Sequence, residues 1–231
     1  MLELRDITFG YHADRPLYEG VSLSVGSDER VAITAPSGFG KTTLCRIAAG
    51  YLVPWSGDVL VDGKPLAARG VRPVQLIMQH PEHALDPRMR MKDSLAEAQS
   101  SLDAQGKMGA QRLSDAQQTS RAKRTSEGLG TANYHLEDLF EVFGIRQEWL
   151  MRFPHELSGG ELQRFCIVRA LLTNPRYLIA DELSTMLDAL TQAQIWHALL
   201  RITEEQHMGM MLVSHSPSLT QRIATRVVNL A

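Results

Sequence analysis

Residues 35–43, "APSGFGKTT", have the types and spacing that can hold a chain of phosphate groups. Gly38 and Gly40 allow consecutive backbone N–H groups to turn towards one anion, at the start of the helix that follows. Lys41 supplies a positive charge for the outer phosphates, and the Thr42 hydroxyl is placed to ligate Mg²⁺. The segment therefore predicts a nucleotide-binding loop, although a glycine-rich turn that only caps a helix can have a similar sequence.

The first position of this loop departs from the pattern G-x-x-x-x-G-K-[ST], because Ala35 replaces a glycine. A positive φ angle at Ala35 would cost about 1–2 kcal/mol. Contacts with phosphate and Mg²⁺ can offset that cost, so we expect nucleotide binding to be weakened at most. The other loop residues that we expect at the nucleotide are Ser37, Phe39 and Thr43.

Two acidic residues follow an apolar run where a buried strand would end. Asp181 at that point can hold Mg²⁺ opposite Thr42. Glu182, one residue later, points in another direction and can polarise a water molecule for attack on phosphate. Acidic pairs after strands are also common as solvated loop residues. The pair therefore indicates a metal and catalytic site only in combination with the phosphate loop upstream.

The segment "LSGGELQR", residues 157–164, predicts a second helix N-terminus that can bind phosphate. Ser158 and Glu161 fit the capping-box pattern S-x-x-E, which alone would explain a well-capped helix. Gly159 and Gly160 are poor helix formers, and each costs about 1 kcal/mol relative to alanine. Their presence in the first turn is better explained if a ligand must approach the backbone closely.

Alternating strands and helices must position these groups. The strands of a mostly parallel sheet are predicted by five short apolar runs, at residues 30–35, 73–79, 175–182, 208–215 and 226–231. Antiparallel strands near the N-terminus are predicted by alternation at 2–9 and 20–25 and by a strand with an Asp-Gly turn within 57–66. In a parallel sheet, ligands gather at the carboxyl ends of the strands, where the loop and the acidic pair are expected.

Residues from about 80 to 170 lack β-branched runs and predict a mainly helical subdomain. Within it, residues 100–133 are polar and low in large apolar side chains, and we assign this insertion no function. The rest of the single domain, residues 1–80 and 171–231, is expected to form the nucleotide-binding core.

The composition excludes several classes of protein. The formal net charge of −2 gives no basic field that would recruit nucleic acid. No apolar run approaches the roughly 20 residues that cross a bilayer, and the N-terminus does not resemble a signal peptide. Cys45 and Cys166 lie in separate apolar segments, which favours buried thiols over a disulfide. We therefore expect a cytosolic chain that reaches a membrane only through another protein.

These motifs together resemble the ATP-binding-cassette (ABC) ATPases of membrane transporters, because "LSGGE" beside a phosphate loop is that family's signature. The resemblance covers nearly the whole chain. It implies an α/β fold: a P-loop NTPase cassette with a mostly parallel core sheet, an N-terminal antiparallel β-subdomain and an inserted helical subdomain. It also implies ATP and Mg²⁺ as ligands, with two cassettes head to tail and each ATP between the loop of one and the signature of the other.

Further residues match the family in chain order. Tyr11 has the position of the aromatic residue that stacks on adenine, for which Tyr18 is a weaker candidate. Gln79 matches the glutamine that touches Mg²⁺ or the attacking water. The other matches are Asp181 for the Mg²⁺-linked aspartate, Glu182 for the catalytic base, Asp188 for the dimer-contact loop and His215 for the γ-phosphate sensor. The usual Pro and Ala of the dimer-contact loop are replaced by Leu183 and Met186.

The stretch "HPEHALDPRMRMKDSL", which starts at His80, resembles the peptide and nickel importer branch. That branch implies a second ABC ATPase subunit, with a heterodimer favoured and a homodimer possible. It also implies transmembrane permease subunits, an extracytoplasmic solute-binding protein that acts indirectly, and a peripheral location on the cytoplasmic face of the membrane. Two alternatives are a soluble ATP-driven switch on nucleic acid or ribosomes, and a small-molecule kinase, which would leave "LSGGE" unexplained.

Overall fold

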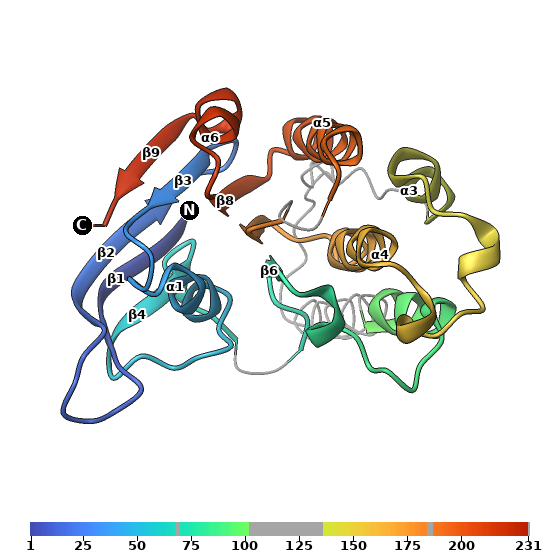
Figure 1. Cartoon of the computed structure of the whole chain (residues 1–231). Helices are drawn as coiled ribbons and strands as arrows, with labels where there is room; N and C mark the ends of the chain where they lie inside the picture. The colour runs from blue at the N-terminus through green and yellow to red at the C-terminus, as the bar shows by residue number, and fades with distance from the viewer. Residues whose placement is uncertain (68–69, 102–135, 184–186, 231) are drawn as a thin grey trace, which may run out of the picture.

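The computed structural model describes residues 1–67, 70–101, 136–183 and 187–230. Within these ranges the chain forms one antiparallel and one parallel sheet, with helices packed against them (Figure 1). The α/β fold class predicted from the sequence is confirmed. Most of the insertion predicted at 100–133 lies outside the described residues, as does Met186.

Each run that predicted a strand contains one. The strands are β1 Leu2–Phe9, β2 Tyr18–Val25, β3 Arg30–Thr34, β4 Ser56–Val61, β5 Lys64–Pro65, β6 Val74–Ile77, β7 Tyr177–Asp181, β8 Gly209–Val213 and β9 Arg226–Asn229. The α-helices with described bounds are α1 Lys41–Ala48, α3 Leu136–Phe143, α4 Gly159–Leu171, α5 Ala189–Glu205 and α6 Pro217–Ile223. A helix also occupies residues 91–101, and 3₁₀ turns lie at Pro81–His83, Gln147–Trp149 and Pro154–Glu156.

The parallel sheet has the strand order β6-β7-β8-β3-β9. Successive residues of a strand point to opposite faces, and both faces of the sheet are covered at β7 and β8. Ile179 and Met211 pack in the core that includes α1 and the antiparallel sheet, whereas Ala180 and Leu212 pack in the core that includes α4 and α5. Burial on both faces explains why β7 and β8 are continuous apolar runs in the sequence, whereas the edge strand β9 is largely exposed.

The antiparallel sheet has the order β2-β1-β4-β5 and shares its core with α1. Strands β4 and β5 form the hairpin predicted from the Asp-Gly pair. Asp62 and Gly63 at its turn have φ angles of 50° and 73°. Positive angles at both central residues match the right-handed twist of the strands, which is why this dipeptide favours a hairpin.

The carboxyl ends of four strands meet at one edge of the parallel sheet because the strands share one direction. Strand β3 leads into residues 35–40 and then α1, and β7 ends at Asp181. Gln79 lies two residues beyond β6, and His215 lies two residues beyond β8. The fold therefore gathers four sequence-predicted segments at a single edge.

Helix α6 was not predicted from the sequence. Ser216 caps it by accepting the Leu219 N–H, and Pro217 occupies its first position. Both are ordinary signals of a helix start, but seven residues are too few to show an amphipathic period.

Cys45 and Cys166 are both buried and unpaired with each other, as the sequence led us to expect. Among the helices in the described ranges, none has the length and apolar character needed to cross a bilayer.

Candidate functional site

The predicted phosphate loop connects β3 to α1. Gly38 and Gly40 have φ angles of 82° and 91°, which favour glycine. Gly40 is the N-cap of α1, and no described side chain caps this helix, so its first N–H groups remain available to an anion. Ala35 is not among the described residues with a positive φ angle, so the strain considered for this alanine does not arise.

Lys41 folds back over its own loop. Its Nζ donates to the carbonyl oxygens of Ala35 and Pro36, at 2.9 and 3.2 Å, and the residue is only 9% exposed. The charge is therefore held inside the curve of the loop by neutral acceptors. A phosphate group is a stronger partner for an ammonium ion than a carbonyl oxygen is, so it can replace either one.

Thr42 and Asp181 meet across the site, where the Thr42 hydroxyl donates to Asp181 Oδ1 at 3.2 Å. Asp181 is 2% exposed. Burial raises the pKa of Asp181 and the charge of Glu182 adds to this effect, while the Thr42 hydrogen bond works against it. A buried carboxylate beside a hydroxyl is a suitable oxygen donor set for Mg²⁺, and a cation there would offset the cost of burying the charge.

Glu182 lies between two polar side chains from neighbouring strand ends. Gln79 Nε2 donates to Glu182 Oε2 at 2.7 Å, and His215 Nε2 lies 2.6 Å from Glu182 Oε1. The Glu182 side chain is 11% exposed, whereas His215 is 54% exposed. Glu182 itself has a φ angle of 50°, which is uncommon for a residue that is not glycine. This backbone turn at the end of β7 directs the carboxylate towards both partners.

The signature segment forms the start of α4. Ser158 Oγ accepts the Glu161 N–H at 3.3 Å, and Glu161 Oε2 accepts the Ser158 N–H at 2.8 Å, which completes the capping box. Because Ser158 Oγ already acts as an acceptor, its own proton remains free to be donated. A Cβ added at Gly160 would lie 3.2 Å from Leu187, so a larger residue would press on the segment that leads to α5.

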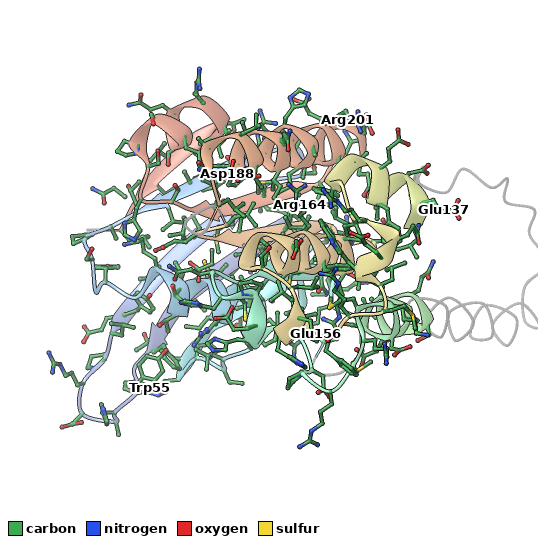
Figure 2. The ribbon with its side chains drawn as sticks, turned by 45° about the vertical axis from the view of Figure 1, so that its right-hand side comes forward. Trp55, Glu137, Glu156, Arg164, Asp188 and Arg201 are labelled. Carbon is green, nitrogen blue, oxygen red and sulfur yellow. The ribbon has the colours of Figure 1, made fainter. Side chains whose placement is uncertain are left out.

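Tyr11 and Asp188 lie at the borders of this region. The Tyr11 hydroxyl lies 3.0 Å from Thr43 Oγ1, and its ring meets Phe9 edge-on with a centroid distance of 5.2 Å. Asp188 lies at the start of α5 (Figure 2). It caps this helix by accepting the N–H groups of Leu190 and Thr191. These backbone N–H groups lower the pKa of Asp188.

The structure thus brings together residues that the sequence predicted separately. Ser37, Gly38, Phe39 and Gly40 form the loop, and Lys41, Thr42 and Thr43 open α1. Asp181, Glu182, Gln79 and His215 surround the same edge of the sheet. Ser158, Gly159 and Gly160 belong to the start of a different helix, α4.

The contacts of two residues near the site were missed by sequence reasoning. The Tyr18 hydroxyl donates to the Gly40 carbonyl, although the sequence suggested Tyr18 only as a weaker candidate for adenine. Arg164 on α4 donates to the Phe143 carbonyl and interacts with the charges of Asp188 and Glu161. The hydrogen bonds of Tyr18 and Arg164 follow no local spacing rule, because their partners lie 22 and 21 residues away in the sequence. Glu161 and Arg164, in contrast, have the i,i+3 spacing of one helix.

The chain is similar to known proteins in both sequence and fold. A family profile described as "ABC transporter" matches residues 18–185. Two Staphylococcus aureus proteins, from strains RF122 / ET3-1 and COL, are both named "Nickel import system ATP-binding protein NikE". They are 30% and 29% identical to this chain over 232 residues, which covers 99% of this chain and 85% of each relative.

Solved structures share the fold. An "ATP binding subunit of ABC transporter" superimposes with a TM-score of 0.76 at 24% identity, covering 100% of this chain and 85% of that one. The dimeric ATP-binding cassette MJ0796, bound to ADP and Pi, gives 0.73 at 22% identity, with 100% and 94% covered. Since the family profile matches more than half of the chain and one relative reaches 30% identity, the chain belongs to the ABC transporter family, as an ATP-binding subunit that hydrolyses ATP.

Proposed function

We propose that this protein powers an ABC importer of nickel, metal chelates or peptides. The observation that carries the hydrolytic part is the position of Glu182 between Gln79 and His215, beside the Thr42–Asp181 pair. The transport part is supported by the relatives named as nickel import ATP-binding proteins, which are similar to nearly the whole chain. The stretch that starts at His80 supports the same branch.

The phosphate loop would hold the nucleotide. Its backbone N–H groups and Lys41 would bind the phosphates, and Tyr11, at the outer border, would stack on adenine. Thr42 and Asp181, with Gln79, would hold Mg²⁺, which supplies charge neutralisation on the phosphates when bound. The free N–H groups at the start of α1 and the buried Asp181 carboxylate fit these ligands.

Glu182 would act as the general base. Each of its carboxylate oxygens already has a polar partner in this structure, Gln79 on one side and His215 on the other. Release of one oxygen would let it accept a proton from a water molecule, while the second contact keeps the carboxylate oriented. The exposed His215 is then placed to donate to the γ-phosphoryl group as charge develops on its oxygens.

A second subunit would complete each site. The Ser158 hydroxyl, with the N–H groups of Gly159 and Gly160, forms a phosphate-binding helix start that belongs to α4 rather than to the loop. We propose that this surface faces the nucleotide of a partner ABC ATPase subunit, with Asp188 at the contact. A heterodimer is favoured by the importer branch, and a homodimer fits the same geometry.

The proposed partners are transmembrane permease subunits, with the protein bound to them at the cytoplasmic face of the membrane. A solute-binding protein outside the membrane would act through the permeases. The test is to tag this chain, isolate its intact complex from membranes, and measure ATP turnover with nickel salts, nickel chelates and peptides. Co-purified permeases and stimulation by one solute class are expected. Recovery with ribosomes or nucleic acid, without permeases, would contradict the proposal.

A further inference from the structure

Tyr18, the first residue of β2, lies directly beneath the end of the phosphate loop. The side chain is 2% exposed and belongs to the core shared by α1 and the antiparallel sheet. Its hydroxyl donates to the carbonyl oxygen of Gly40, and its ring packs against Phe39 with a centroid distance of 5.8 Å and an interplanar angle of 52°. A hydroxyl from the antiparallel sheet is therefore buried against the backbone of the loop.

The space beside Gly40 is filled by the same residue. A Cβ at Gly40 would lie 2.6 Å from Leu17 Cδ2 and would also overlap the Tyr18 hydroxyl. With its φ angle of 91°, Gly40 is required here both by its backbone conformation and by the close approach of these two side chains. The end of the phosphate loop and the start of β2 therefore pack against each other at Gly40.

The hydrogen bonds of the Gly40 carbonyl oxygen affect the orientation of the neighbouring Lys41 N–H. It accepts the Leu44 N–H at 3.0 Å, the first bond of α1, and the Tyr18 hydroxyl occupies a second direction. The same rigid, trans peptide unit carries the Lys41 N–H, which must point away from the Gly40 oxygen. A group that orients this carbonyl therefore also orients the first free N–H of α1.

The donor is present across the physiological pH range. Burial, with a smaller contribution from Cys45, raises the pKa of Tyr18 above its ordinary value. The phenol therefore keeps its proton, and the carbonyl keeps its partner.

We propose that Tyr18 is a positioning residue of the nucleotide site: its hydroxyl fixes the Gly40–Lys41 peptide unit so that the Lys41 N–H points at bound phosphate. This inference rests on the proposed role of the loop in binding ATP. Tyr18 touches no nucleotide itself. It supplies from another sheet an orientation that the loop sequence alone does not impose.

The matched test compares Tyr18→Phe with Tyr177→Phe. Tyr177 is a tyrosine of the same core and is also 2% exposed. Both variants lose one buried hydroxyl, so both should lose similar stability. Only Tyr18→Phe should weaken ATP and ADP binding, by about three- to tenfold, as expected when a neutral hydrogen bond is lost.

The kinetic readout separates positioning from damage. The Lys41 N–H would hold phosphate equally before and during reaction, so Tyr18→Phe should raise KM with kcat unchanged. Equal affinity losses in both variants, or nucleotide affinity of Tyr18→Phe within twofold of wild type, would overturn the inference. If wild type itself failed to bind ATP, the proposed function would fail instead. If Tyr18→Phe does not fold, the Tyr18 hydroxyl proton of the wild-type protein can be observed by NMR instead. Fast exchange of that proton with solvent would refute the inference, because it would show that the hydroxyl is not held by the Gly40 carbonyl.

Discussion

The sequence predicts phosphate sites at two helix N-termini, the starts of α1 and α4. In the structure these two helix starts differ in their capping and in the charge of their first turn. At α1, Gly40 is the N-cap, and neither a described cap nor an acidic residue in the first turn competes for its N–H groups. At α4, Ser158 and Glu161 cap each other, and the Glu161 carboxylate lies in the first turn. An anion therefore meets open donors at α1 but a partly satisfied, partly negative helix end at α4.

The difference extends to the surroundings. Thr42, Asp181 and Glu182 from this same chain lie beside the start of α1. The capping contacts of α4 are made within residues 158–161. This difference supports the proposal that α1 would set the affinity for nucleotide, whereas α4 would add its Ser158 proton and glycine N–H groups when another subunit brings a nucleotide to it.

Glu182→Gln should have the largest effect, because it removes the proposed general base beside the start of α1. We expect kcat to fall by about 10²–10⁴-fold, the usual contribution of general base catalysis. ATP binding should persist, and the bound form should accumulate as a closed dimer, measurable by size-exclusion chromatography with ATP. Glu148→Gln, at an exposed ion pair on a 3₁₀ turn, serves as the control. Turnover at the wild-type rate in Glu182→Gln would refute the assignment.

Ser158→Ala tests the α4 side. Loss of a donor to a charged group should lower turnover by about 10- to 100-fold. The ATP affinity of the isolated subunit, measured at low protein concentration, should not change. Ser216→Ala is the control, because Ser216 caps α6 through the same type of bond, to the Leu219 N–H. If Ser158→Ala weakened ATP binding by the monomer, the division of roles between the two helix starts would be wrong.

Asp181→Asn should separate stability from function at α1. Burial raises the folded-state pKa of Asp181, so the folded state binds its proton more tightly than the unfolded state does. The free energy of unfolding therefore falls as pH rises through that raised pKa. At neutral pH the amide should raise Tm by about 2–4 °C without nucleotide, the effect of about 1 kcal/mol in a domain of this size. ATP turnover should fall, and a lower Tm at neutral pH would contradict this account.

Glu161→Gln should have the smallest effect. Glutamine can still accept the Ser158 N–H, but the negative charge at the start of α4 disappears. ATP-dependent pairing should tighten by about two- to fivefold, as measured by analytical ultracentrifugation. Glu156→Gln is the control, since Glu156 accepts the Phe153 N–H in the same way at the preceding 3₁₀ turn. Equal effects of both changes would show that general surface charge is responsible.

Much of the site could be predicted because its parts are local. Gly38 and Gly40, the capping box of Ser158 and Glu161, and the Asp-Gly hairpin are each encoded within a few residues. The short apolar runs likewise predicted the strands of the parallel sheet. The seven-residue helix α6 was missed because its cap signals had no periodic pattern to support them.

Other features depend on which strands are neighbours. Gln79 reaches Glu182 across 103 residues of sequence, because β6 and β7 pair in parallel and end at the same edge. The strain-free backbone at Ala35 and the hydroxyl of Tyr18 beneath Gly40 likewise became visible only in the folded chain.

By itself, the sequence determined which chemical groups are present: a phosphate loop, an acidic pair and a capped, glycine-containing helix start. It also determined most of the strands and helices that hold these groups. The tertiary structure decided which groups meet. The physical reason is that turns, caps and periodic burial arise from contacts within a few residues, whereas the order β6-β7-β8-β3-β9 is set by long-range packing of both sheet faces.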